Sequence, residues 1–175
     1  MLKLKTASAG CATIVITAAM LTACSSTGTQ VATVRGGAVN LKQVRVGTPG
    51  KIFQDAAITF APDPNGAVAG KVQYLSRLED ADGSQFVVQV KNNECYEISL
   101  INRNKQLSRD AAIAKMQNLL PASVIAAGEP VVKPVPGRQA DSFTWNKKFR
   151  GELDYTDASR KDVSMISATR LGVTF

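Results

Sequence analysis

Hydrophobic and polar residues alternate most regularly between positions 86 and 100. Apolar side chains occupy every second position in two successive runs, which are Phe86, Val88 and Val90, and then Tyr96, Ile98 and Leu100. Alternation of this kind is typical of strands that bury one face. Segment 91–94 between the runs contains two asparagines, which tolerate the positive φ angles of tight turns. The pattern therefore predicts an antiparallel β-hairpin.

Weaker strand patterns precede this hairpin. Segment 31–46 alternates loosely, and its apolar residues change parity near Lys42–Gln43, which predicts a bulge or bend there. Ile52–Phe60 and Val68–Leu78 are the next expected strands. The sequence Pro62-Asp63-Pro64-Asn65-Gly66 between them is a dense turn signal.

Strand patterns return from Ser142 to the end of the chain. Phe143 and Trp145 lead into a run with period two that ends at Tyr155. Segments 148–155 and 163–175 are therefore predicted to pair as a second hairpin around a polar turn. A short helix over 163–170 stays open as an alternative, because Val163, Ile166 and Arg170 also fit a period of 3.6 residues.

One helix is expected, over Ser108–Leu120. Ser108 can cap the first free amides, and an apolar stripe at helical spacing follows it, formed by Ala112, Ile113, Met116, Leu119 and Leu120. Pro121 ends the helix, and further prolines make 121–140 an expected extended and irregular connection. The chain thus reads as mainly β (or α+β): an antiparallel, β-rich, sandwich-like domain with one main helix near 108–120.

The first 24 residues carry a different pattern. Lys3 and Lys5 precede the apolar run Ala12–Leu21, and small and polar residues follow it. Positive charge, apolar core and small-residue site in that order are typical of a secretory signal peptide. The run is too short for a membrane-spanning helix, which needs about 20 apolar residues.

The tetrapeptide Leu21-Thr22-Ala23-Cys24 resembles the lipobox of bacterial lipoproteins. The resemblance implies that Cys24 is diacylated on sulfur, becomes the first residue after cleavage and is acylated on its new amine. Ser25 at the next position resembles lipoproteins of the cell outer membrane, so we expect a lipid-anchored domain that faces the periplasm. Several acyl chains hold a protein stably at a membrane. An ordinary signal peptide with an incidental Cys24 remains the alternative.

Removal of the signal peptide, residues 1–23, leaves a flexible tether, 24–33, and a single β-rich globular domain, 34–175. The full chain has a net charge of +7, and without its leader it keeps 19 basic and 14 acidic residues. A basic envelope protein can bind anionic polymers such as peptidoglycan or lipopolysaccharide. Nucleic acid is not an expected partner, because no basic stripe with interleaved aromatic residues is present.

Cysteine usage agrees with an exported chain. Cys11 leaves with the leader and Cys24 carries lipid, so Cys95 would be the one free thiol of the processed chain. An intramolecular disulfide is then impossible, even in an oxidising compartment. We expect Cys95 to be a small buried hydrophobe, and a reactive or intermolecular thiol is the alternative.

The absence of histidine removes most catalytic arrangements. No Ser-His-Asp or Cys-His pair can form, and one free cysteine is too few for a zinc site without histidine. Asp80-Ala81-Asp82-Gly83 lacks the remaining ligands of a calcium loop, and no phosphate-binding or dinucleotide-binding glycine motif occurs. Asp154 with Asp157 or Glu152 is the remaining candidate, as a carboxylate pair of a hydrolase. We expect no enzyme, no cofactor and no metal.

Segment 104–130 carries a second resemblance. Its residues are Asn104-Lys105-Gln106-Leu107-Ser108, Ala112, Leu119, Pro121-Ala122-Ser123 and Gly128-Glu129-Pro130. They resemble the helix and exit loop of peptidoglycan-binding OmpA-like domains, and the resemblance implies an adaptor for the cell wall. The arginine of that family falls on Ala111 here, and no segment with the ligand-binding aspartate precedes Asn104.

The sequence therefore favours a non-catalytic binding or assembly component of the cell envelope, with a protein partner in a secretion or pilus machine as one possibility. An adaptor for peptidoglycan or another anionic polymer is the second hypothesis. A hydrolase that uses only carboxylates is the third.

Overall fold

The computed structural model describes residues 33–34, 37–57, 59–66, 70–77, 79, 83–102 and 106–172. The predictions on the signal peptide, on Cys24 and on most of the tether lie outside these residues. So do the Asp80–Asp82 turn and the last three residues. Within the described part of the chain, no helix is both long and apolar enough to cross a membrane.

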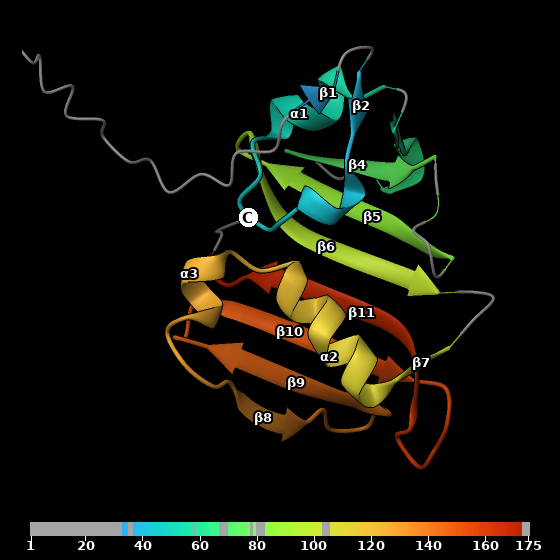
Figure 1. Cartoon of the computed structure of the whole chain (residues 1–175), viewed down its shortest axis with the longest axis vertical. Helices are drawn as coiled ribbons and strands as arrows, with labels where there is room; N and C mark the ends of the chain where they lie inside the picture. Colours follow the sequence, from blue (N-terminus) through green and yellow to red (C-terminus); the bar gives the residue numbers. More distant parts are fainter. Residues whose placement is uncertain are drawn as a thin grey trace, which may run out of the picture.

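A nine-stranded antiparallel sheet is the main element of the fold (Figure 1). Its strands are β3 (Phe60–Pro62), β4 (Lys71–Ser76), β5 (Ser84–Lys91), β6 (Glu94–Asn102), β7 (Leu107–Ser108), β8 (Val131–Pro134), β9 (Ala140–Trp145), β10 (Phe149–Tyr155) and β11 (Asp162–Arg170). Their order is β3-β4-β5-β6-β11-β10-β9-β8, and β7 pairs with β11. The short strands β1 (Thr33–Val34) and β2 (Ala38–Val39) pair separately. The prediction of a mainly antiparallel β-rich domain is confirmed.

Helical segments supply the second layer. They are η1 (Leu41–Gln43), α1 (Gly50–Asp55), η2 (Pro64–Gly66), α2 (Arg109–Asn118) and α3 (Ala122–Ile125). In Figure 1, α2 and α3 lie over the face formed by β9, β10 and β11, and η1 (cyan) lies on the same side over β5 and β6. The layer that packs against the main sheet is thus helical, and the sheet is a single open one.

The two halves of the chain repeat one order of elements. The first half runs η1, α1 and then β3 to β6, and the second runs α2, α3 and then β8 to β11. The last strands of the halves, β6 and β11, pair antiparallel at the middle of the sheet, with Ile98 opposite Ala168. Pro49 and Pro121 occupy the N-cap positions of α1 and α3. The shorter strands β3 and β8 are left at the two edges, and each ends at a proline.

Both predicted hairpins form. Asn92 and Asn93 adopt φ angles of 51° and 59° in the turn between β5 and β6, as the sequence predicts. The second hairpin pairs β10 with β11, with Leu153 opposite Ile166, so 163–170 is a strand and the helical alternative is wrong. The bend predicted near Lys42–Gln43 is the helical turn η1.

The predicted main helix is α2, and it closes the core over β10. Ser108 accepts a hydrogen bond from the Ala111 amide at 3.4 Å, which caps the helix. Met116 is fully buried against Gly151 of β10, where a Cβ atom would lie well under 3.0 Å from the Met116 sulfur. A Cβ atom at position 151 would therefore require either the Met116 side chain or the helix to shift.

Two segments have a structure that differs from the one predicted. Ile52–Phe60 is not a strand: helix α1 occupies its first part, since Phe53 and Ala56 fall at helical spacing and both are buried. Segment 121–140 is not wholly irregular, because it contains α3 and the edge strand β8. Proline suits both positions, since it can precede a helix and can end an edge strand.

A buried carboxylate joins the strands at one end of the sheet. The Asp141 carboxylate accepts a hydrogen bond from the Tyr155 hydroxyl at 3.0 Å. It also forms an ion pair with Arg160 at 2.6 Å. The Arg109 guanidinium lies 3.6 Å from the same carboxylate and donates to the Tyr155 oxygen at 3.2 Å. This network, called the Asp141 network below, ties β9, β10, the 156–161 turn and the start of α2 together.

Candidate functional site

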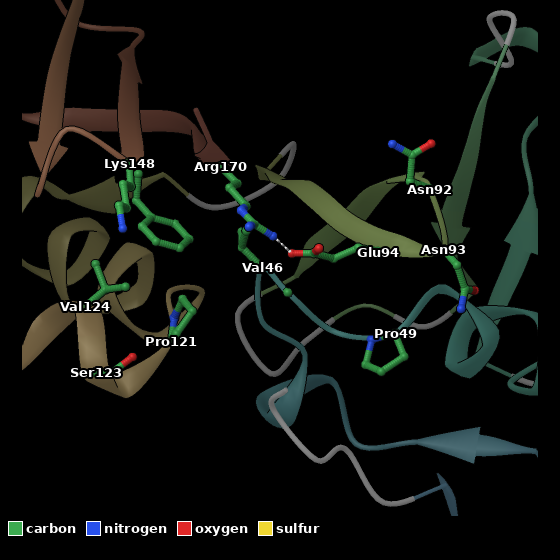
Figure 2. A pocket seen from close by; sticks show the side chains of 12 residues that line it. Val46, Pro49, Asn92, Asn93, Glu94, Pro121, Ser123, Val124, Lys148 and Arg170 are labelled. Atoms are coloured by element: carbon green, nitrogen blue, oxygen red, sulfur yellow. Dashed lines mark hydrogen bonds and ion pairs between the residues drawn. The ribbon is translucent and has the colours of Figure 1, made fainter. Parts of the chain in front are cut away.

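A cleft of about 690 Å³ opens where the two halves of the chain meet (Figure 2). Its walls come from segment 46–49, the turn 92–94, segment 121–124, residues 148–149 and Arg170. Clefts of about 300–1,000 Å³ are typical of sites that hold small ligands or side chains of a partner. We call it the inter-half cleft and treat it as the candidate site.

The wall from the first half is fixed by backbone contacts. The Gly50 amide donates to the Asn93 carbonyl at 2.8 Å, and the Gly47 amide donates to the Cys95 carbonyl at 2.7 Å. A Cβ atom at Gly50 would lie 2.5 Å from a methyl group of Val90, so this position also needs glycine. These contacts hold the 92–94 turn against the start of α1.

The wall from the second half is fixed in a similar way. The Val124 amide donates to the Pro121 carbonyl at 2.9 Å at the start of α3. The Lys148 amide donates to the Trp145 carbonyl at 3.0 Å, and the Lys148 carbonyl accepts from the Leu171 amide at 2.7 Å. The backbone on both sides of the cleft is thus held by hydrogen bonds.

One ion pair crosses the cleft. Figure 2 shows the side chains of Glu94 and Arg170 pointing toward each other beside Val46, joined by a dashed line. The two side chains are 37% and 44% exposed, so water screens the pair and its contribution to stability is at most about 1 kcal/mol. Its position matters more than its energy, because it links the turn of one half to the last strand of the other.

The cleft lacks the arrangement of a nucleophile with a base. Ser123 and Lys148 both line it, and the structure shows no hydrogen bond between their side chains. Over the residues that the structure describes, no group of three or more cysteine, aspartate or glutamate side chains could hold a metal ion. The lining offers polar and charged groups that can take part in recognition.

The carboxylates named from the sequence lie elsewhere. Arg138 forms ion pairs with Glu152, at 2.5 Å, and with Asp154, and Glu152 also pairs with Arg150. Asp157 lies in the following turn, where the Ser159 amide donates to its carboxylate at 2.8 Å and lowers its pKa. The structure therefore brings Glu152 and Asp154 together around an arginine and leaves Asp157 apart from them.

Cys95 is a buried residue, as the sequence predicts. Its side chain is fully enclosed, its sulfur lies 3.6 Å from the Glu97 carbonyl, and burial raises the pKa of the thiol. A buried protonated thiol reacts slowly, because the thiolate is the nucleophile.

We expect Cys95 to resist thiol reagents until the domain unfolds. In the full chain with Cys11→Ser and Cys24→Ser, Cys95 is the remaining thiol. An aromatic disulfide reagent should leave it unmodified in native buffer for hours and modify it completely within minutes in urea. Rapid modification in native buffer would show that the enclosure is wrong.

The carboxyl group of Glu97, on the face of the sheet opposite the helices, makes the stability of the domain depend on pH. Burial raises the pKa of its carboxyl, Lys71 and a hydrogen bond with Ser99 oppose this, and Glu152 adds to the rise. A carboxyl whose pKa is raised on folding costs stability when it is ionised, and the cost disappears as pH falls through the raised pKa.

Glu97→Gln is therefore expected to raise the urea midpoint at pH 7, and the gain should shrink toward pH 4. The amide has no charge to bury, so the ionisation cost is absent at every pH. Glu129→Gln, at an exposed position, is the matched control and should leave the midpoint unchanged. A gain that grew at low pH would contradict the sign of the effect.

Sequence reasoning did not find the Glu94–Arg170 pair. The two residues are 76 positions apart and meet because β6 pairs with β11 and because the 92–94 turn folds beside segment 46–49. A local pattern carries no information about such a contact.

Comparison with protein-family models, with curated proteins and with solved structures finds no match to this chain. The resemblance of segment 104–130 to OmpA-like domains therefore stays a prediction. Within it, Ala111 is an exposed residue of α2, while Asn104 and Lys105 lie outside the described residues.

Proposed function

We propose that the chain is a lipoprotein anchored to the cell outer membrane through Cys24, with its domain in the periplasm. There it acts as a non-catalytic binding or assembly component of the envelope. The inter-half cleft is the observation that carries the binding role. Its walls are held by backbone hydrogen bonds, and its lining combines charged and polar side chains with apolar ones such as Val46 and Phe149. Its described residues include no paired nucleophile and base.

The anchoring is tested by metabolic labelling with an alkyne fatty acid in a bacterial host. The full chain should incorporate the label and fractionate with the outer membrane, and Cys24→Ser should abolish both. Cys95→Ser is the matched control and should incorporate the label fully, because that thiol is buried. Labelling that survives Cys24→Ser would contradict the proposal.

The binding role is tested by photo-crosslinking in cells. A photoreactive side chain at Ser123, at the exposed rim of the cleft, should yield one discrete adduct. The same probe at Ser159, in the exposed 156–161 turn, is the control and should yield none.

A charge swap then tests the cleft itself. Arg170→Glu places two acids together and should abolish the adduct, whereas Arg170→Glu with Glu94→Arg restores an ion pair and should recover it. An adduct that is indifferent to both variants would place the partner outside the cleft.

An adaptor for an anionic envelope polymer is the second candidate, supported by the excess of 19 basic over 14 acidic residues that remains without the leader. Sedimentation with purified peptidoglycan should recover the protein at low salt and release it at high salt. The carboxylate hydrolase has less support, because Glu152 and Asp154 are both engaged by Arg138.

A further inference from the structure

The face of the sheet opposite the helices contains a hollow of about 320 Å³. Three hydroxyl side chains on the two central strands form its floor: Ser99 of β6, and Ser167 and Thr169 of β11. Ser99 lies opposite Ser167 in the strand register, and Thr169 lies opposite Glu97. We call it the outer hollow; it shares no residue with the inter-half cleft.

Side-chain length explains why a hollow forms here. The short Thr169 and Ser167 of β11 lie opposite the long Arg150 and Glu152 of β10. Side chains on one face of paired strands stand next to one another, so the long ones rise around the short ones. The floor residues are half-buried, and within the described part of the chain the hydroxyls of Ser167 and Thr169 have no hydrogen-bond partner. Both hydroxyls are therefore available to a ligand.

Four charged side chains form the walls of the outer hollow, and carboxylates compensate both arginines. Arg138 forms ion pairs with Glu152, at 2.5 Å, and with Asp154, which is outside the lining, and Arg150 pairs with Glu152. Among the described residues, the fourth charged side chain, Glu97, forms no ion pair. Three carboxylates thus accompany two guanidinium groups, and the excess negative charge lies at Glu97.

The Glu97 carboxylate is only partly stabilised by its surroundings. A hydrogen bond with Ser99 and the charge of Lys71, which lies over the Tyr96 ring outside the hollow, favour the ionised form. Burial and the charge of Glu152 nevertheless raise the pKa of Glu97. A carboxylate that a hollow holds at a cost in stability is typical of a binding site.

The groups in the outer hollow match a primary ammonium group on an alkyl chain. An ammonium group has three N–H donors and no acceptor. The carboxylate of Glu97 and the hydroxyls of Thr169 and Ser167 can accept all three. The two apolar lining residues, Met165 and Leu171, are both partly exposed, so they offer surface that an alkyl chain can cover.

We propose that the outer hollow binds the side chain of a lysine presented by a protein partner. Its ammonium group lies between Glu97 and Thr169, and its alkyl chain lies against Leu171. The charge of the lysine complements the excess negative charge of the hollow. This proposal goes beyond the proposed envelope role, because it assigns a second site and the chemistry of the group that enters it.

The surface around the hollow favours a protein over a free amine. Ser142 and Thr144 of β9 lie opposite Glu152 and Arg150, and Val87 of β5 lies opposite Ser99 on the other side. Ser142, Thr144 and Val87 are all partly exposed. The hollow is therefore surrounded by accessible sheet surface, which a small amine would leave in water and a protein surface can cover.

The test uses the full chain with Cys24→Ser, labelled with ¹⁵N, and the peptide acetyl-Gly-Ser-Lys-Ser-Gly-amide. The peptide should cause saturable shifts of the amide signals of Glu97 and Thr169, with a Kd of about 1 mM, and added salt should weaken binding. The same peptide with Nε-acetyl-lysine keeps the alkyl chain and loses the charge. It should cause no saturable shift at either residue.

Three variants locate the binding. Glu97→Gln should weaken peptide binding at least about tenfold, since the charge-assisted contact is lost. Because this variant is expected to be more stable than the parent chain, unfolding cannot explain the loss. Thr169→Val keeps the shape of the side chain without its hydroxyl and should weaken binding about fivefold. Glu129→Gln removes the same charge at an exposed position outside the hollow and should leave binding unchanged.

Peptide binding that is absent, that is equal for the acetylated peptide or that is unaffected by Glu97→Gln overturns the proposal. Butylammonium that bound as tightly as the peptide would assign the hollow to free amines and overturn the protein partner. The crosslink from Ser123 reports on the inter-half cleft, so its failure would leave this test intact.

Discussion

Gly151→Val is expected to destabilise the domain by about 3 kcal/mol, the upper end of the usual cost of overpacking a core. The position lies on a central strand and faces the buried side chain of Met116 at a separation that leaves no room for a Cβ atom. Either α2 must move away from the sheet or Met116 must leave its rotamer. Urea unfolding followed by the fluorescence of Trp145, the one tryptophan of the chain, measures the loss.

A double variant separates this steric cause from a general loss of strand structure. Met116→Ala alone leaves a cavity and is expected to cost about 2–4 kcal/mol. Combined with Gly151→Val it should cost clearly less than the sum of the two, because the valine fills part of the space. Thr144→Val, on the neighbouring strand and away from α2, is the matched control. Strict additivity of the two core variants would contradict the contact.

Asp141→Ala is expected to cost about 2 kcal/mol. Removing one partner from a buried ion pair typically costs about 3–5 kcal/mol. The value is lower here because the side chains of Arg109 and Arg160 are 40% and 36% exposed, so water partly solvates them once the carboxylate is gone. The Tyr155 hydroxyl also loses its acceptor.

Asp55→Ala is the matched control for that variant. Asp55 forms a single exposed ion pair with Lys51 within α1, and such a pair is worth at most about 0.5 kcal/mol. Thermal unfolding of the two variants should therefore separate them by several degrees. Equal midpoints would show that the Asp141 network does not hold the end of the sheet together.

The elements that the sequence predicted correctly are those whose signal is local. The first hairpin carries its turn chemistry in Asn92 and Asn93, and α2 carries its cap in Ser108 and its stop in Pro121. Period-two burial in β5 and β6 follows directly from alternating side chains. No partner outside each element is needed to recognise these signals.

Helix α1 shows why the rest could not be predicted. Its residues include Ile52 and Phe53, which prefer strands, and its six residues are too few for a helix to be stable alone. Packing decides the outcome: Gly50 fits against the first hairpin, and Phe53 meets Phe60 edge to face at 5.0 Å. Tertiary contacts override local preference in this segment.

The candidate site was beyond sequence reasoning for a related reason. The inter-half cleft exists because β6 pairs with β11, and these two strands are separated in the chain by α2, α3 and four strands. Residues that are far apart in the sequence, such as Glu94 and Arg170, meet only after the sheet has formed.

The two edge strands affect whether copies of this protein associate edge to edge at high concentration. An exposed edge can recruit a strand from a second molecule, which is the first step of fibril growth. Here β3 has three residues and ends at Pro62, and β8 has four residues and ends at Pro134. A proline offers no amide hydrogen to an incoming strand. Short length and a terminal proline therefore disfavour growth of the sheet from molecule to molecule at both of its edges.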